Sequence, residues 1–205
     1  MFIEQQLTNK SLANRKPIYG IAINDSPYKS YNDQGDICPY YKVWTRMLSR
    51  CYGENKKKCY VDCFVCEEWH IFSAFKKWMK QKNWENLHLD KDIIFPGNKE
   101  YRPEYCDFVS RQLNNLIVGA SYNGGPYMKG VSYEKSSNKY RSNLRTNGVL
   151  KSLGSFNTEI EANNAYRKAK SKSLIYAAGN TDNARIKGGL ILHANLILNK
   201  DGIYA

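Results

Sequence analysis

Two stretches in the first half of the chain repeat apolar side chains at the spacing of an α-helix. In a helix, residues three or four positions apart lie on the same face, so such a repeat predicts a face that packs into a core. Both stretches are rich in aromatic residues, and we assign them a structural role only. The first consists of Tyr41, Trp44, Leu48 and Cys51, and the second of Trp69, Phe72, Phe75 and Met79.

From residue 87 onward the helical spacing gives way to alternation. Residues 87–93 alternate like a half-buried strand, 95–98 have the composition of a turn, and 101–109 lead the chain back. Ser110 then stands where the N-cap of a short helix is expected. The order strand, loop, strand, helix predicts a small ββα module.

A segment rich in Gly and Asn at residues 121–126 marks the strongest boundary in the chain. Beyond it, three short runs at 130–133, 139–145 and 149–156 have the composition of strands. The last two are separated by Thr146-Asn147-Gly148, and an Asn-Gly pair at this place is a strong signal for a β-hairpin. A three-stranded antiparallel sheet is therefore predicted.

A helix is predicted to pack on this sheet. Thr158 and Glu161 are spaced as a capping box, in which two side chains satisfy free backbone groups at the start of a helix. Together the elements indicate an α+β fold. We divide the chain into an N-terminal extension (1–38), a helical and ββα domain (39–119), a sheet-and-helix domain (127–180) and a C-terminal helix (181–205).

The positive charge of the chain is concentrated in its second half. The net charge is +12. Residues 1–119 contain 18 Lys and Arg against 14 Asp and Glu, whereas residues 120–205 contain 13 against 5. A basic surface attracts polyanions over long distances and gains affinity from counterion release. The composition thus favours a nucleic acid as partner without separating DNA from RNA.

Alternation along the middle strand predicts which basic residues the sheet presents to solvent. Tyr140, Ser142 and Leu144 are expected to face the helix. Arg and Asn side chains match the edges of guanine and adenine, and a small sheet fits the major groove of DNA. A solvated basic face is the alternative. The residues expected to face outward are Arg141, Asn143 and Arg145, joined by Lys151 from the next strand.

Four groups of residues in this domain match a known pattern. They are Lys129-Gly130-Val131, Tyr140-Arg141, Leu153-Gly154-Ser155-Phe156 and the segment Glu161–Tyr166. In this order they resemble the Apetala-type (ethylene-response-factor) DNA-binding domain. Because the sheet of that family lies in the major groove, the resemblance implies that the chain binds double-stranded DNA. It implies that Arg141, Asn143, Arg145 and Lys151 contact the DNA.

A second set of residues lies between positions 41 and 116. It comprises Trp44, Met47, Arg50-Cys51-Tyr52, Val65-Cys66-Glu67-Glu68-Trp69, Leu89-Asp90-Lys91, the Pro103-Glu104 and Cys106 positions after Tyr101, and Asn114-Asn115. This set resembles phage-type HNH (His-Me finger) endonucleases. Such proteins often carry an Apetala-type domain after the nuclease domain, the order found here.

The second resemblance implies a metal-dependent nuclease site. Asp90 would hold a Mg²⁺ or Mn²⁺ ion, and Asn114 or Asn115 would add a ligand from the helix. Lys91 stands where the family has the His that acts as general base. Lysine ordinarily titrates near 10.4, and a protonated Lys91 would instead steady the phosphate. His88, two residues before Asp90 on the same strand, is the second candidate base.

Six cysteines raise the question of a further metal. Cys63 and Cys66 have the Cys-x2-Cys spacing of many structural zinc sites, and Cys51 and Cys106 are further candidates for a tetrahedral Zn²⁺ site. Buried free thiols are the alternative, because cysteine packs as a small apolar residue.

No run of about 18 apolar residues occurs, so we expect no membrane partner. The first residues lack the basic-then-apolar layout of a secretion signal, and we expect the protein in the cytoplasm of the host cell of a phage. Three functions stay open: an endonuclease that nicks or cleaves DNA, a DNA-binding regulator whose HNH fold has lost its chemistry, and an inhibitor or adaptor that acts on a host protein.

Overall fold

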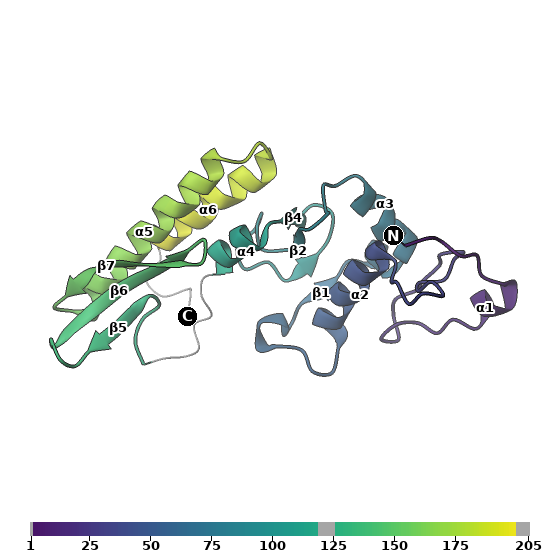
Figure 1. The fold of residues 1–205 in the computed structure, drawn as a ribbon, viewed down its shortest axis with the longest axis horizontal. Coiled ribbons are helices and arrows are strands. Elements are labelled where there is room, and N and C mark those ends of the chain that lie inside the picture. Colours follow the sequence, from purple (N-terminus) through teal and green to yellow (C-terminus); the bar gives the residue numbers. More distant parts are fainter. Residues whose placement is uncertain (1, 119–125, 200–205) are drawn as a thin grey trace. The chain divides into compact units, whose positions relative to one another are not determined.

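A computed structural model describes residues 2–118 and 126–199 of the chain. Helices and strands are mixed in it, in agreement with the expected α+β class (Figure 1). Contacts divide the chain into two compact units. Unit 1 comprises Met1–Asp92 and Gly97–Phe108, and unit 2 comprises Ile93–Pro96 and Val109–Ala205. The four segments expected from the sequence are based on composition and motifs, not on contacts, and their boundaries stay predictions.

Two helices form the centre of unit 1. Helix α2 (Pro39–Tyr52) corresponds to the first aromatic repeat, and its predicted face is buried at Trp44, Leu48 and Cys51. The second repeat begins in a short 3-10 helix, η2 (Glu67–His70), and continues as α3 (Phe72–Lys80). Trp44 Nε1 donates a 2.7 Å hydrogen bond to the carbonyl oxygen of Trp69. The two repeats therefore meet in one core.

Short strands border this core. The 3-10 turn η1 (Lys58–Tyr60) leads to β1 (Phe64–Val65), which pairs in parallel with β3 (Glu100–Tyr101). The predicted strand at 87–93 is reduced to β2 (His88–Asp90), which is paired with β4 (Asp107–Val109). Between β3 and β4, turns replace the continuous strand expected there.

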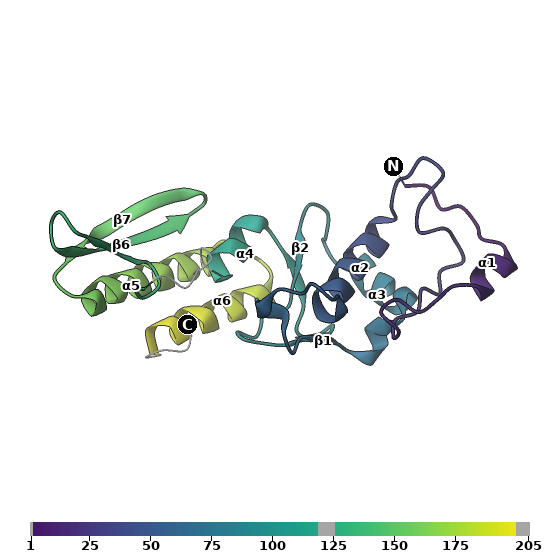
Figure 2. The ribbon, with the colours of Figure 1, turned by 90° about the horizontal axis from the view of Figure 1, so that it is seen from below.

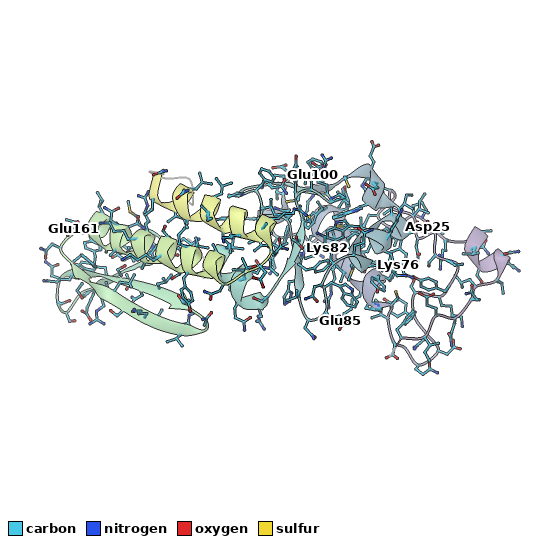
Figure 3. The ribbon with its side chains drawn as sticks, turned by 90° about the horizontal axis from the view of Figure 1, so that it is seen from above. Asp25, Lys76, Lys82, Glu85, Glu100 and Glu161 are labelled. Carbon is cyan, nitrogen blue, oxygen red and sulfur yellow. The ribbon has the colours of Figure 1, made fainter. Side chains whose placement is uncertain are left out.

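The first 38 residues are part of unit 1. Apart from α1 (Asn9–Ala13), this segment is irregular. It is attached by Asp25, whose Oδ1 accepts the backbone N–H of Ser73 (2.9 Å) at the start of α3, and by Lys76, which donates to Glu4 and to Tyr28 at 2.7 Å each. Figure 3 labels Asp25 and Lys76. The segment thus completes the core of unit 1.

Unit 2 contains the predicted three-stranded antiparallel sheet. Its order is β5 (Val131–Glu134), β6 (Lys139–Thr146) and β7 (Val149–Phe156). Asn147 and Gly148 form the turn between β6 and β7 with φ values of +51° and +82°, the left-handed backbone that an Asn-Gly hairpin requires. The sequence signal for this hairpin is confirmed.

Three helices accompany the sheet: α4 (Arg111–Val118), α5 (Glu159–Gly179) and α6 (Ala184–Asn199). The capping box that begins α5 is present, with Glu161 (Figure 3) accepting from the backbone N–H of Thr158 and Thr158 accepting from that of Glu161, both at 3.2 Å. Helices α5 and α6 lie side by side (Figure 2). No helix in the described ranges is long and apolar enough to cross a membrane.

The sheet is held on α5 by a close contact of the backbone. Gly130 has a φ of +79°, and a Cβ at this position would lie 2.1 Å from the ring of Tyr166. Only glycine therefore allows the chain entering β5 to lie against this ring. Farther along, α5 shares a second core with α4 and α6, built on Leu116, Leu174 and Leu190.

Candidate functional site

The outer face of the sheet presents basic side chains, as the alternation along β6 predicts. Ser142 and Leu144 are buried beneath it, whereas Arg141 and Arg145 are exposed and Asn143 is half-buried. In a strand, successive side chains point to opposite faces, so Arg141, Asn143 and Arg145 share the face away from α5.

Lys151 lies on the other face. The register pairs Leu144 with Lys151 and Arg145 with Leu150. Residues directly opposite each other in an antiparallel pair lie on the same face of the sheet, so Lys151 shares a face with buried Leu144. The expectation that Lys151 joins Arg141, Asn143 and Arg145 on one face is therefore wrong. Its side chain is exposed, and contact with DNA stays a prediction for it.

The two outward arginines differ in their partners. Arg141 is held by Glu134 of β5, with Nε donating to Oε2 at 2.9 Å and Nη2 lying 2.6 Å from Oε1. Arg145 Nη1 donates to the carbonyl oxygen of Gly148 at 3.1 Å. Glu134 did not stand out in the sequence, although it is the only acidic residue between positions 126 and 158.

In unit 1, Asp90 and Lys91 occupy buried positions at the end of β2. Asp90 Oδ1 accepts the backbone N–H of Asp92 at 2.8 Å. Lys91 Nζ lies 2.9 and 3.0 Å from the two carboxylate oxygens of Asp92 and donates to the carbonyl oxygen of Asn98. Asn98 in turn donates to the carbonyl oxygen of Lys91 at 2.9 Å. Lys91 and Asn98 thus close the loop between β2 and β3.

This setting fixes the protonation state of Lys91. Burial lowers the pKa of its ammonium group, but the charge and hydrogen bonds of Asp92 outweigh burial, so the pKa lies above the ordinary lysine value. Lys91 is therefore charged at neutral pH and already donates to two groups. Of the two roles that the sequence leaves open for it, the structure favours the cationic one over the general base.

Arg50 is a further cation near Asp90. Its Nη1 donates to the carbonyl oxygen of Leu89 (3.4 Å), the residue before Asp90, and to the Tyr101 hydroxyl (3.5 Å). The Arg50 guanidinium also interacts electrostatically with Asp90. In the sequence, Arg50 stands out only as part of the Arg50-Cys51-Tyr52 motif. With Arg50 and Lys91 beside it, the Asp90 carboxylate has two positive neighbours that compete with a divalent ion.

The other residues of the implied nuclease site are distributed as follows. His88 is exposed at the start of β2. Asn114 is half-buried and Asn115 exposed, and both lie on α4 in unit 2, whereas Asp90 belongs to unit 1. In unit 1 the Asp90 carboxylate is flanked by cations, and the carboxylate of Asp92 is paired with Lys91. This set does not fit a Mg²⁺ or Mn²⁺ ion. We therefore derive no catalytic step through a metal.

The cysteines of the implied zinc site are free thiols. Cys51, Cys63 and Cys106 are buried and Cys66 is partly buried. Burial raises the pKa of the Cys51 thiol to about 12 and raises the pKa values of the other three. Among residues 2–118 and 126–199, no three His, Cys, Asp or Glu side chains gather as a metal-binding group. The zinc site stays a prediction without structural support.

Comparison with known proteins adds no relative. No family model matches the chain, and searches of curated proteins and of solved structures found no significant match. The residues and their geometry are therefore the basis for assigning a function.

Proposed function

We propose that this chain binds double-stranded DNA through the outer face of the β5–β7 sheet. The observation that carries the proposal is the exposed pair Arg141 and Arg145, on the face of the sheet opposite α5. An arginine offers a planar fork of donors that matches guanine or phosphate oxygens. The excess of positive charge in this half of the chain supplies the long-range attraction.

Two contacts support the Apetala-type resemblance on which the docking mode rests. Gly130 and Tyr166, which belong to separate matching groups, lie against each other. Asn163, from the matching helix segment, donates to the carbonyl oxygen of Lys129 at 3.0 Å. Residues distant in sequence thus fix the same joint between sheet and helix, and this joint leaves the outer face of the sheet uncovered by α5.

The test compares Arg145→Ala with Lys172→Ala in the whole protein, using binding to a random-sequence 20-base-pair duplex at several salt concentrations. Lys172 is exposed on α5, so its variant removes the same charge from another element. Arg145→Ala should weaken binding and lower the salt slope by about one. If the two variants lose affinity equally, the sheet is not the contact surface.

A second candidate is the HNH-type endonuclease, which nicks or cleaves the bound DNA. It is favoured by the placement of His88 and Asp90 on the short strand β2, with buried Lys91 directly after Asp90. In that function His88 would act as base and Lys91 would steady a phosphate. The resemblance alone assigns a Mg²⁺ or Mn²⁺ ion to Asp90 and to Asn114 or Asn115.

Supercoiled plasmid and phage DNA, incubated with Mg²⁺, Mn²⁺ or EDTA, distinguish the two candidates. Asp90→Asn is compared with Asp62→Asn, which removes a charge from an exposed position of unit 1. Metal-dependent product that Asp90→Asn alone abolishes establishes the nuclease. DNA binding without product leaves the regulator. Weak DNA binding together with a stable host-protein partner identifies the inhibitor or adaptor.

A further inference from the structure

The outer face of the sheet, which we propose to contact DNA, contains one acidic side chain. This side chain, Glu134, is paired with Arg141. Glu134 is the only Asp or Glu between positions 126 and 158. It lies on β5 two positions after Ser132, which pairs with Arg141, and is itself opposite Lys139. Glu134 therefore lies on the same outer face of the sheet as Arg141. Its carboxylate also accepts the hydroxyl of Ser137 at 2.7 Å. Glu134 is thus itself held in place at the first turn of the sheet.

The geometry of the pair leaves a particular part of Arg141 available. A guanidinium has five N–H donors. Glu134 engages the side formed by Nε and Nη2, at 2.9 and 2.6 Å. In the described part of the chain, Arg141 has no other hydrogen bond or ion pair. Both N–H groups of Nη1 and the second one of Nη2 therefore remain. One N–H of Nη1 and the remaining N–H of Nη2 lie parallel and form the end-on edge of the fork.

We propose that Glu134 is a positioning residue that fixes Arg141 for bidentate recognition of guanine through this end-on edge. The inference rests on the proposed DNA binding and deepens it. A guanine presents two acceptors, O6 and N7, to the major groove, and two parallel donors match them. An unrestrained arginine would lose side-chain entropy on binding, whereas the ion pair has already restricted Arg141 in the free protein.

Removing the Glu134 carboxylate should have two opposite effects, one on affinity for DNA and one on base preference. Glu134 is an anion on a surface that meets phosphates, so its removal should strengthen binding to DNA of any sequence. Its removal also frees Arg141 to move, so the preference for guanine at one position should fall. A residue that acts only through its charge would change the first quantity and leave the second unchanged.

The experiment uses full-length wild-type protein, Glu134→Gln, Arg141→Ala and the charge control Asp182→Asn. Asp182 is an exposed residue between α5 and α6. Each protein selects from a random duplex pool, and sequencing gives the base preference at every position. Affinity for the unselected pool is measured in parallel. In the free protein, ¹⁵N relaxation of the Arg141 Nε–H group reports its mobility.

We expect wild type and Asp182→Asn to select guanine at a position where Arg141→Ala loses the preference about tenfold or more. Glu134→Gln should lose it at the same position, bind the unselected pool more tightly, and show a mobile Nε–H group. An unchanged guanine preference in Glu134→Gln overturns the inference, as does a rigid Nε–H group. If no protein binds the pool in a salt-dependent way, the proposed DNA binding itself fails, and the relaxation data still report on the ion pair.

Discussion

Two adjacent glycines in α6 give a prediction with an internal control. Gly188 is exposed, and a Cβ there would meet nothing within 4 Å. A Cβ on Gly189 would lie 2.0 Å from the carbonyl oxygen of Ile93 and 2.9 Å from the Cα of Ile94. The backbone of 93–94, which belongs to unit 2, therefore crosses α6 at Gly189. Gly189→Ala and Gly188→Ala add the same methyl group to these two environments.

The magnitude follows from two opposing effects. Replacing glycine by alanine inside a helix gains about 1 kcal/mol from propensity at either position. At Gly189 the methyl group collides with backbone atoms that cannot rotate away, and overpacking of this kind costs about 1–3 kcal/mol or more. The propensity gain is shared and cancels in the comparison. We expect Gly189→Ala to be less stable than Gly188→Ala by about 1–3 kcal/mol.

The four tryptophans allow the assay to separate the units. Trp44, Trp69, Trp78 and Trp84 all lie in unit 1. Urea unfolding followed by far-ultraviolet ellipticity reports mainly the long helices α5 and α6 of unit 2, with a smaller contribution from α2 and α3 of unit 1, while tryptophan fluorescence reports unit 1 alone. The urea midpoint of the ellipticity transition should be lower for Gly189→Ala than for Gly188→Ala. A Gly189→Ala protein that is as stable as Gly188→Ala would refute the close crossing of 93–94 over α6.

Three further predictions concern stability. Thr158→Ala removes half of the capping box and should cost about 1 kcal/mol in the ellipticity transition. Burial lowers the pKa of Lys170 to about 8. Between pH 8 and 10 the unfolded chain therefore binds more protons than the folded one, and the free energy of unfolding should rise with pH. Lys170→Met should flatten this rise and add about 2–3 kcal/mol at pH 7, and a rise with pH that persists in the variant would contradict the prediction. Lys91→Met removes the ion pair with Asp92 and the donor to the carbonyl oxygen of Asn98, and should destabilise unit 1 by about 1–3 kcal/mol, measured by tryptophan fluorescence.

Local signals predicted much of the fold. The Asn147-Gly148 turn and the Thr158–Glu161 capping box depend on residues a few positions apart, and both are present in the structure. Helices whose buried faces follow a regular spacing were predicted for the same reason. The strands of unit 1 were overestimated, because β2 and β3 are short and their loop is closed by side chains. That closure joins Lys91 to Asn98, a pairing that no periodicity reveals.

The face of Lys151 could have been deduced from the predicted turn. A two-residue turn at 147–148 places Thr146 opposite Val149, and therefore Leu144 opposite Lys151. A register shift next to Ser142 then moves the rest of β7 by one residue, so that Phe156 pairs with Tyr140. Gly154, with a φ of +124°, lies beside this shift. A glycine inside a strand often marks such a bulge.

The predicted nucleic-acid contacts differ in whether their charge is already paired with a carboxylate, which sequence position does not show. Lys91 and Arg141 each face a carboxylate, from Asp92 and Glu134 respectively. A cation that is already paired gains less from a phosphate, because the ion pair must be given up or shared. Arg145 donates only to a backbone carbonyl among the described residues, and its charge is not neutralised by that bond. Arg145 should therefore contribute more to sequence-independent affinity than Arg141, whose contribution should be concentrated in base preference.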